Sequence, residues 1–313
     1  MRILVVGAGA IGGYFGGRLL EAGCDVTFLL RARRAAQFEA SGLVIKSRLG
    51  DFSLLPAPYL LAEDIGTPFD LVVVSCKAYD LEQTMESFAP AVGSETAILP
   101  LLNGLRHVEE LEARFGRQCV LGGLCMISAT LDPSGVIVHL NDLHRVSFGE
   151  LDGTRSSRIA RTNTLFARAK FEAHASTEIL QEMWEKWIFI ASLGGINTLA
   201  RASVGDIVTA GAVDLATALY DECSAIARFN DFPPRAPAVA GARAVLTTPG
   251  SSLTASLLKD IERGAPTEGE HIIGDLYRRA PHDARSSDTS LLRTACAAVR
   301  AYEVRRAREN LPA

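Results

Sequence analysis

The stretch RILVVGAGAIGGYFGGRLLEAG, from Arg2 to Gly23, decides the fold of the first part of the chain. A short run of strand composition leads into Gly7, Gly9 and Gly12 in G-x-G-x-x-G spacing, and a helical pattern follows at once. In such a turn the first glycine permits the sharp bend, the second lets a pyrophosphate approach the backbone, and the third lets the helix pack closely on the strand. The free N–H groups at the helix start favour an anion. The stretch therefore predicts a dinucleotide site in preference to a glycine-rich turn that binds nothing. The residues of this predicted site are Gly7, Ala8, Gly9, Ala10, Ile11 and Gly12.

The first half of the chain is expected to form a parallel sheet flanked by helices. Its apolar runs are hydrophobic on consecutive positions, as in strands that are buried on both faces. These runs are Arg2–Val6, Val26–Leu30, Leu71–Ser75, Ala97–Leu101 and Cys119–Leu124. After Leu131, the segments GVIVHL and HRVSFGE predict an antiparallel addition at the far side of the sheet, and AKFEAHAS is a last candidate strand or connector.

From Thr177 onward, strand patterns give way to long helical ones. The expected helices are Glu178–Ser192, Val213–Asn230, Ser252–Arg263, Glu268–Ala280 and Ser290–Arg308. The segments NDFPPRAP and LTTPGSS would form interhelical loops, since their prolines and glycines do not continue a helix. The sequence therefore predicts an α/β protein with two domains. A Rossmann-like, doubly wound dinucleotide-binding domain would span residues 1–173, and an all-helical substrate-binding and catalytic domain would span residues 174–313.

The composition indicates a small-molecule partner rather than a macromolecule. The 313 residues carry a formal net charge of -4, which offers no overall attraction to nucleic acid or to an anionic membrane. The six cysteines are scattered, with no C-x-x-C pair and no histidine at metal spacing, which indicates reduced thiols and no metal site. Glycines interrupt the apolar start, so we expect a strand and not a signal peptide, and no apolar run reaches membrane-spanning length. These features predict a cytoplasmic protein, and a homodimer is compatible with them.

The end of the second expected strand selects between nicotinamide cofactors. An acidic residue about 20 positions past the fingerprint would bind the ribose 2′-hydroxyl of NAD, whereas an arginine there accommodates the 2′-phosphate of NADP. Here the strand VTFLL is followed by Arg31, Arg33 and Arg34, with no acid before Glu39. NADP(H) is therefore the predicted cofactor, with Arg31 as the first candidate for the phosphate contact and Arg34 as a second. A solvated basic turn is the alternative interpretation.

Two polar residues follow neighbouring strands of the expected sheet. Lys77 comes directly after LVVVSC, and Asn103 with Gly104 comes after AILPLL. Ligands of doubly wound sheets bind beyond the carboxyl ends of the strands, so an ammonium and a carboxamide at two such ends favour a cofactor and substrate site. Each residue alone would be ordinary loop chemistry, because Asn-Gly is also a plain turn signal.

Lys186 lies between Trp184 and Trp187, the two tryptophans of the chain. The expected helix places Lys186 at the flank of an apolar stripe that includes Ile190, where burial would lower the pKa of the ammonium. A lysine of that kind suits a general acid that delivers a proton to a carbonyl oxygen. A lysine that extends its charge to water is the alternative, and the helix alone does not decide between them.

The segment SLLKDIERGAPTEGEHIIGDLYRRA carries Ser256 and Glu268. The GAP turn ends one expected helix, and Glu268 lies at the start of the next. A carboxylate at this position has a common structural use as well, since it complements the helix dipole.

Taken together, these motifs resemble the ketopantoate reductase (2-dehydropantoate 2-reductase) family over nearly the full length. The resemblance rests on GAGAIG, the strand-end LLR, SCKA, LNG, MWEKW and the long segment from Ser256 to Ala280. It implies an NADPH-binding Rossmann-like domain, a helical second domain and a substrate cleft between them. It also implies transfer of hydride to the 2-keto carbon of ketopantoate, which gives pantoate.

The resemblance implies a role for each matched position. Lys186 corresponds to the acid that protonates the nascent alkoxide, Glu268 to a catalytic carboxylate that engages the substrate hydroxyl, and Ser256 to a contact of the substrate carboxylate. Lys77 and Asn103 correspond to residues of the cofactor and substrate crevice.

The chain departs from the family pattern on the helix that carries Lys186. Family members have substrate-binding asparagines at the positions of Ile190 and Gly194, and another asparagine at the position of Ile273. Asn197, further along the same helical pattern, is a candidate substitute for the lost amides, although it would also fit a following turn. A site that loses amide donors binds a polar ligand more weakly, so the reaction type is better supported than the substrate.

The expected function is NADPH-dependent reduction of a 2-keto acid, with ketopantoate as the first substrate. A more apolar 2-keto acid or ketone is the second interpretation, because Ile190 and Gly194 would suit it. An NADP(H)-binding sensor that has lost catalysis is the third, and the presence of Lys186 and Glu268 disfavours it.

Overall fold

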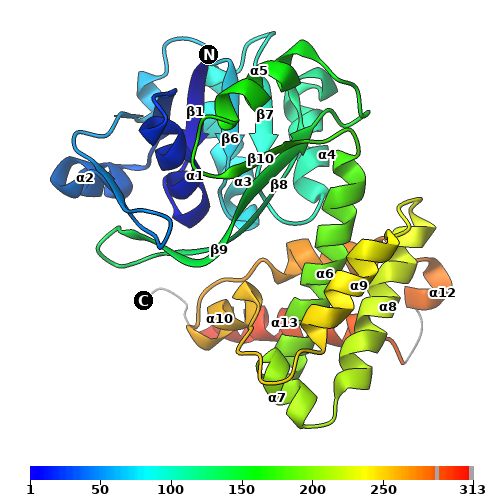
Figure 1. Ribbon diagram of the computed structural model, residues 1–313. Coiled ribbons are helices and arrows are strands. Elements are labelled where there is room, and N and C mark those ends of the chain that lie inside the picture. Colours follow the sequence, from blue (N-terminus) through cyan, green and yellow to red (C-terminus); the bar gives the residue numbers. More distant parts are fainter. Residues whose placement is uncertain (286–288, 310–313) are drawn as a thin grey trace. The chain divides into compact units, whose positions relative to one another are not determined.

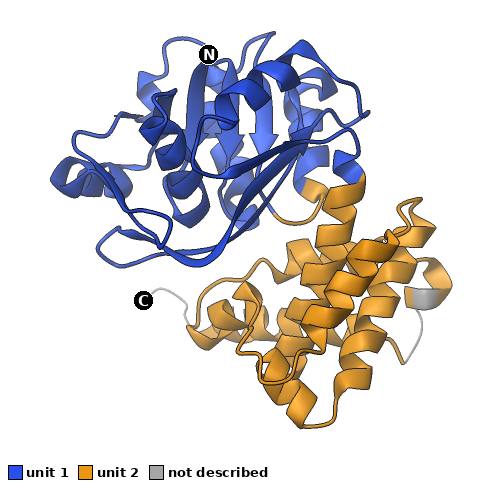
Figure 2. Ribbon diagram, in the orientation of Figure 1, with its two compact units in different colours: residues 1–102, 107–180 blue, residues 103–106, 181–313 orange. Residues whose placement is uncertain are grey.

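The computed structural model describes residues 1–285 and 289–309, which form two compact units (Figure 2). The first unit comprises residues 1–102 and 107–180, and the second comprises residues 103–106 and 181–313. The sequence places the domain boundary after residue 173, whereas strand β10 (Glu172–Ala175) crosses that position. The first unit therefore continues to Leu180 and includes the first residues of helix α6 (Ile179–Ala200).

The first unit contains the predicted parallel sheet, in the order β5-β2-β1-β6-β7. Figure 1 labels its strands β1, β6 and β7. Its strands are β1 (Arg2–Val6), β2 (Asp25–Leu29), β5 (Tyr59–Leu60), β6 (Leu71–Val74) and β7 (Ala97–Pro100). Every pairing in it is parallel, so all carboxyl ends lie at one edge. The chain leaves β1 toward β2 on one side and later adds β6 and β7 on the other, which makes the β1/β6 boundary the switch point where doubly wound sheets bind ligands. The helices of this unit are α1 (Ala10–Glu21), α2 (Ala32–Ser41), α3 (Leu81–Phe88), α4 (Arg106–Phe115) and α5 (Ser157–Phe166).

A second sheet in this unit differs from the prediction. It has the order β10-β9-β3-β4, and β8 pairs with β9. Its strands are β3 (Leu43–Lys46), β4 (Phe52–Leu54), β8 (Gly122–Leu131), β9 (Ile137–Gly149) and β10 (Glu172–Ala175). The predicted run Cys119–Leu124 thus leads into an antiparallel strand of this sheet, and β3, β4 and β5 have no counterpart among the predicted strands.

The segments GVIVHL and HRVSFGE belong to one continuous strand, β9, and the antiparallel pairing that they predict is made with β8 in the second sheet. The chain reverses earlier, where the carboxylate of Asp132 accepts the backbone N–H of Val136 at 2.8 Å and Gly135 has a φ of +89°. Asn141 has the composition of a turn residue but lies beside the register shift between β8 and β9, where its Oδ1 accepts the N–H of Ser128 at 3.0 Å. Asparagine serves turns and bulges equally well, and only the pairing distinguishes them.

Helix α1 packs tightly against both sheets because its faces carry glycines. A Cβ at Gly16 would lie 2.7 Å from the ring of Phe28 in β2, and one at Gly17 would lie 2.6 Å from Ile45 in β3. Such contacts are shorter than real Cβ atoms tolerate, so these glycines set the distance between the helix and the two sheets. The stretch that predicts the ligand site therefore also organises the core of the unit.

The second unit is helical throughout its described residues, as predicted. Its helices are α6 (Ile179–Ala200), α7 (Val204–Thr209), α8 (Val213–Phe229), α9 (Ala236–Leu246), α10 (Ser256–Glu262), α11 (Asp275–Arg278), α12 (His282–Arg285) and α13 (Leu291–Glu309). Helix α9 begins within the expected loop NDFPPRAP, with a proline in its first turn, where the missing N–H is no loss. The expected helix Glu268–Ala280 is helical over residues 269–278, and its first part is a π-helical turn, η5 (Glu270–Gly274), which runs directly into α11. Among residues 1–285 and 289–309, no helix is both long enough and apolar enough to cross a membrane.

Candidate active site

The glycine turn of the first unit has the geometry of an anion cradle. Gly7 has a φ of +88°, and its N–H donates to the carbonyl oxygen of Leu29 at 3.0 Å. A Cβ at Gly7 or Gly9 would meet no heavy atom within 4 Å, whereas one at Gly12 would clash with the side chain of Ser75 and the carbonyl oxygen of Gly7. The first two glycines therefore adjoin open space, and the third permits close packing, which is the division of roles that a dinucleotide needs.

The start of α1 is suited to receive a negative charge. Its N-cap is Gly9, and within this described helix no side chain caps the first turn and no acidic residue lies in it. The N–H groups of a helix start and the helix dipole both favour an anion at such an end. The predicted residues Ala8, Ala10 and Ile11 form the rest of this turn. Its chemistry fits the pyrophosphate of a dinucleotide.

The two candidate arginines have different environments. Arg31 is exposed, and its guanidinium lies 3.6 Å from Asp80 and 3.3 Å from the amide oxygen of Gln83. Arg34 is half-buried and donates to the carbonyl oxygens of Ala8 at 3.1 Å and Gly135 at 3.0 Å. Burial lowers the pKa of Arg34, although Asp132 partly opposes the change. The structure thus assigns Arg34 to bracing the glycine turn, and Arg31 is left as the candidate for a 2′-phosphate.

The carboxyl end of β6 meets the glycine turn through a residue that the sequence reasoning missed. Ser75 donates a hydrogen bond to the carbonyl oxygen of Val6 at 3.2 Å and lies against Gly12. The only signal for it was its place directly after a buried strand. Two residues later, the half-buried Lys77 is the N-cap of the short helix η2 (Ala78–Asp80). Lys77 is therefore placed at the same sheet edge as the glycine turn, as the strand ends predicted.

Helix α6 holds Lys186 between two anchored neighbours. Trp187 is fully buried, and its indole N–H donates to the carbonyl oxygen of Ile272 at 2.8 Å. On the other side, Arg235 forms a bidentate ion pair with Glu185. Its Nε donates to Oε1 at 2.9 Å, and its Nη2 donates to Oε2 at 2.7 Å. Lys186 itself is half-buried. Because both neighbours are held, the rotation of the helix about its axis is held, and so is the direction of the Cα–Cβ bond of Lys186.

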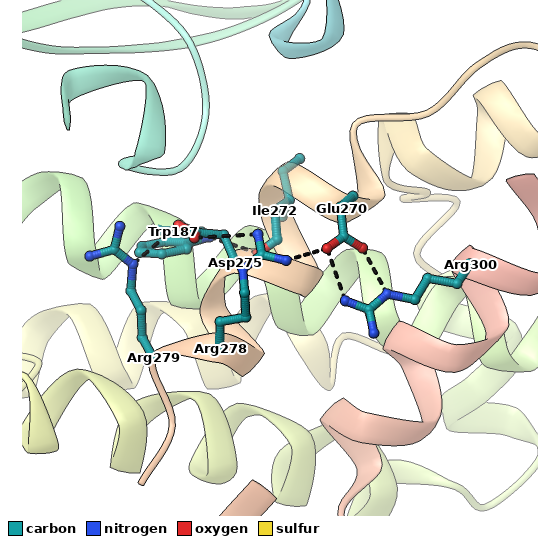
Figure 3. Close-up of polar contacts among 7 residues, drawn as sticks. All are labelled: Trp187, Glu270, Ile272, Asp275, Arg278, Arg279 and Arg300. Atoms are coloured by element: carbon teal, nitrogen blue, oxygen red, sulfur yellow. Dashed lines mark hydrogen bonds and ion pairs between the residues drawn. The ribbon is translucent and has the colours of Figure 1, made fainter. Parts of the chain in front are cut away.

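The π-helical turn η5 lies against the chain neighbours of several predicted site residues, and Figure 3 shows Ile272 of this turn with Trp187. Glu268 is 9% exposed and lies just before the turn, and its carbonyl oxygen accepts the N–H of Ile272 at 2.9 Å. The carbonyl oxygen of Ile272 also accepts the indole N–H of Trp187, the neighbour of Lys186. A Cβ at Gly104, next to Asn103, would lie 3.2 Å from the ring of His271 in the same turn. One turn thus contacts the immediate neighbours of Lys186 and Asn103 and adjoins Glu268; π turns of this kind are frequent at functional sites.

Ser256 is the first residue of α10, and α6 holds it from both sides. The N–H of Ala255 donates to the side-chain oxygen of Asn197 at 2.8 Å, and Leu257 packs against Gly194. Ser256 itself is exposed. The serine is therefore presented at the start of a helix whose position α6 determines.

Asn197 has a structural role that replaces the predicted substrate contact. Its side chain is fully buried, its oxygen accepts from Ala255, and its nitrogen donates to the carbonyl oxygen of Ala202 at 2.8 Å. An amide engaged at both ends between two loops is not available to compensate for lost substrate donors. The alternative weighed from the sequence, that it belongs to a following turn, describes this arrangement better.

The departures from the family pattern are also explained by packing. A Cβ at Gly194 would lie 3.3 Å from Cδ2 of Leu257, so α10 leaves little room for a side chain there. Ile190, one turn closer to Lys186, is half-buried, and Ile273 is fully buried in the π turn. The helix that carries Lys186 thus presents apolar groups where the family pattern has amides. Within the part of the chain that the structure describes, no group of three or more histidine, cysteine, aspartate or glutamate residues could hold a metal ion.

Comparison with known proteins matches both halves of the chain to one family. The family described as Ketopantoate reductase PanE/ApbA matches residues 3–153, and its C-terminal domain matches residues 178–303. The chain is 39% identical over 304 residues to Uncharacterized oxidoreductase YkpB of Bacillus subtilis, covering 97% of this chain and 99% of that protein. It is 28% identical to 2-dehydropantoate 2-reductase of Mesorhizobium japonicum, covering 87% and 89% of the two chains.

Solved structures show the same fold over nearly the whole length. The crystal structure of 2-dehydropantoate 2-reductase from Geobacter metallireducens superposes with a TM-score of 0.86 at 27% identity, covering 96% of this chain and 99% of that one. The corresponding enzyme from Methylococcus capsulatus has a TM-score of 0.86 at 26% identity, covering 98% of each chain. The predicted resemblance is confirmed: the chain belongs to the ketopantoate reductase family of oxidoreductases.

Proposed function

We propose that this protein reduces a 2-keto acid to the 2-hydroxy acid with NADPH, and that ketopantoate is the first substrate to test. The observation that carries the proposal is the π turn η5, which adjoins Glu268 and contacts the neighbours of both Lys186 and Asn103. The glycine turn, with open space at Gly7 and Gly9, supports a dinucleotide cofactor. Family membership supports the reaction type.

In the proposed reaction, the bound nicotinamide supplies a hydride to the keto carbon. Lys186 Nζ donates a proton to the carbonyl oxygen, so the C=O bond becomes CH–OH with one hydride and one proton added. The ammonium becomes an amine, which water reprotonates before the next turnover. General acids placed in this way contribute typically about 10²- to 10⁴-fold to the rate.

The other residues of the site have binding roles in this proposal. Ser256 receives the substrate carboxylate, and Asn103 orients the keto acid. Glu268, which is almost buried, is the carboxylate that accepts a hydrogen bond from a substrate hydroxyl. Lys77 and the glycine turn bind the cofactor.

The preference for NADPH over NADH rests on Arg31. It follows the second strand, where no acid competes for a ribose hydroxyl, and it is 63% exposed. Its contacts with Asp80 and Gln83 are long and exposed, so a phosphate dianion would displace them at little cost. We also place the protein in the cytoplasm, which the six cysteines support, since all of them are thiols rather than disulfides in the described chain.

A more apolar 2-keto acid is the second candidate substrate. Ile190 has an aliphatic group where the family resemblance implies an amide, and the packing of Leu257 on Gly194 leaves little room for a polar side chain. A hydroxyl on the substrate would lack the amide partners that a polar pocket supplies, which favours substrates without one.

The experiment is a steady-state panel of 2-keto acids, ketopantoate included, measured with NADPH and with NADH. We expect turnover of one or more 2-keto acids with NADPH. With NADH as the cofactor, kcat/KM should be at least about tenfold lower than with NADPH. Ketopantoate as the best substrate would support the first candidate, and a branched or aromatic 2-keto acid would support the second. Binding of NADPH without turnover of any member would overturn the proposal in favour of a sensor.

A further inference from the structure

One face of helix α13 holds the backbone on both sides of Glu268. On the near side, the N–H and the hydroxyl of Thr267 both donate to Oε1 of Glu303, at 2.8 Å and 2.6 Å. Thr267 is 8% exposed, so these hydrogen bonds lie in a largely dry environment, where their geometry is well defined. Glu303 therefore determines where the chain enters the turn that carries Glu268.

On the far side, Arg300 holds the first residue of the π turn. Its Nε and Nη2 donate to the two carboxylate oxygens of Glu270, at 2.8 Å and 2.9 Å, and Arg278 of α11 donates to the same carboxylate (Figure 3). A Cβ at Gly274 would lie 2.6 Å from this carboxylate, so the glycine gives it room. The bidentate geometry fixes the orientation of the Glu270 carboxylate as well as its distance from Arg300.

Between these two contacts, the backbone rests directly on the helix. A Cβ at Gly269 would clash with Val299 of α13, so only a glycine allows this approach. Val299, Arg300 and Glu303 lie within about one turn of the helix. Glu268 therefore projects from a segment that is held at residues 267, 269 and 270 by one face of α13.

The same segment continues into the π turn, which is hydrogen-bonded to helix α6. The π turn ends at Gly274. Within this turn, the carbonyl oxygen of Ile272 accepts a hydrogen bond from the indole N–H of Trp187. A shift of the turn would therefore move Glu268 and the hydrogen bond of Trp187, next to Lys186, at the same time. We propose that Glu303 and Arg300 are positioning residues that set the carboxylate of Glu268 relative to Lys186 in the reaction; this inference rests on the proposed function.

The ion pair between Arg300 and Glu270 is too exposed to contribute much stability, which separates the positioning role of Arg300 from a structural one. For Glu303, whose partner Thr267 is buried, the Glu303→Gln variant makes this separation. Glu270 is 47% exposed and Arg300 is 50% exposed. Pairs of this kind contribute little to folding. A small displacement of a reacting group has a much larger effect on rate, by about 100-fold for an error of about 1 Å.

The test compares the variants Glu303→Ala, Glu303→Gln and Arg300→Met with the control Arg308→Met. Gln keeps a side-chain oxygen that accepts the Thr267 donors, whereas Ala removes it. Arg308 lies on the same helix and is exposed, with its ion-pair partner at Glu309, 3.2 Å away. Three quantities are measured: kcat/KM for the best 2-keto acid, KM for NADPH, and the fluorescence emission of Trp184 and Trp187, the two tryptophans of the chain.

We expect Glu303→Ala and Arg300→Met to lower kcat/KM for the keto acid by about tenfold to 100-fold. KM for NADPH should stay within about twofold, since the glycine turn contains none of these residues. Glu303→Gln should recover most of the activity, and the tryptophan emission should change in Glu303→Ala but not in Arg308→Met.

Unchanged kcat/KM and emission in both variants would overturn the inference. A parallel loss of keto-acid and cofactor affinity together with a large fall in Tm would overturn it as well, because it would indicate a role in folding only. If the wild-type protein turns over no 2-keto acid, the proposed function fails. In that case the emission still decides whether α13 positions the π turn, and unchanged emission contradicts it.

Discussion

The indole N–H of Trp187 donates to the carbonyl oxygen of Ile272 over 2.8 Å, and it thereby joins helix α6 to the π turn η5. Trp187 directly follows the candidate acid Lys186, and Ile272 lies just beyond the candidate carboxylate Glu268. One buried hydrogen bond thus connects the chain segments of the two residues on which the proposed chemistry depends.

Removal of this hydrogen bond should lower both stability and activity. In Trp187→Phe, the carbonyl oxygen of Ile272 loses its indole donor, and we expect a loss of about 1–3 kcal/mol in the free energy of unfolding. Denaturant titration measures this loss, and steady-state kinetics should show a fall in kcat. The control is Trp184→Phe, which preserves the Trp187 bond and an aromatic ring against Phe232. Equal stability of the wild type and Trp187→Phe would contradict the expectation.

Lys186→Met should abolish most of the turnover and leave the fold intact. Met keeps much of the aliphatic stem but has no proton to donate, so kcat should fall by about 10²- to 10⁴-fold. Thermal unfolding should remain close to that of the wild type, because the side chain is only half-buried. Full activity of this variant would exclude Lys186 as the proton donor.

Arg31→Ala should raise KM for NADPH by about tenfold and leave KM for NADH nearly unchanged, because only NADPH carries the 2′-phosphate. Arg33→Ala, an exposed neighbour, is the matched control. Arg34→Ala should behave differently, since Arg34 donates to Ala8 and Gly135 and its loss should lower Tm. An identical response of both cofactors to Arg31→Ala would contradict the NADPH preference.

Gly194→Asn, which restores the family residue, should disturb the site rather than improve it. The new Cβ would lie 3.3 Å from Cδ2 of Leu257, so Leu257 has to move to admit the larger side chain. If the start of α10 holds Leu257 in place, the overpacking costs about 1–3 kcal/mol. Displacement of α10 should also raise KM for the keto acid through Ser256. Gly241→Ala in α9 is the opposite case: its Cβ would meet nothing within 4 Å, and we expect a gain of about 0.5–1 kcal/mol. Chemical unfolding of both variants decides whether Gly194 is limited by space.

The ion pair of Glu270 should make a small, pH-dependent contribution to stability. Hydrogen bonds from Arg300 lower the pKa of the Glu270 carboxyl, against an opposing effect of burial. A lowered pKa stabilises the folded state above the ordinary carboxyl pKa of about 4.3, and the stabilisation is lost as the pH falls through the lowered value. Glu270→Gln should therefore be less stable than the wild type at neutral pH, by about 0.5 kcal/mol given the exposure of the pair. Unfolding curves should converge below about pH 4, and a constant difference at all pH values would contradict this origin.

Much of the dinucleotide-binding unit could be predicted from local patterns. The strand, the glycine spacing and the following helix are contiguous in the chain, so the roles of Gly7, Gly9 and Gly12 follow from their spacing. The second sheet could not be predicted in the same way. Its strand β9 pairs with its chain neighbour β8 and also with β3 and β10, which are more distant in sequence. The polar residues Asn141 and Asp142 within β9 have the composition of a turn.

In the helical unit, too, local patterns predicted some features and tertiary contacts decided others. The sequence by itself determined that the second half is helical, that Lys186 flanks an apolar stripe, and that Glu268 follows a turn, since these depend on periodicity and on glycine and proline. Only the tertiary structure decided that Asn197 braces α10, that Arg34 braces the glycine turn, and that the helix after Glu268 begins with a π turn. Those outcomes depend on hydrogen-bond partners and on contacts between residues distant in the chain, and no local pattern encodes them.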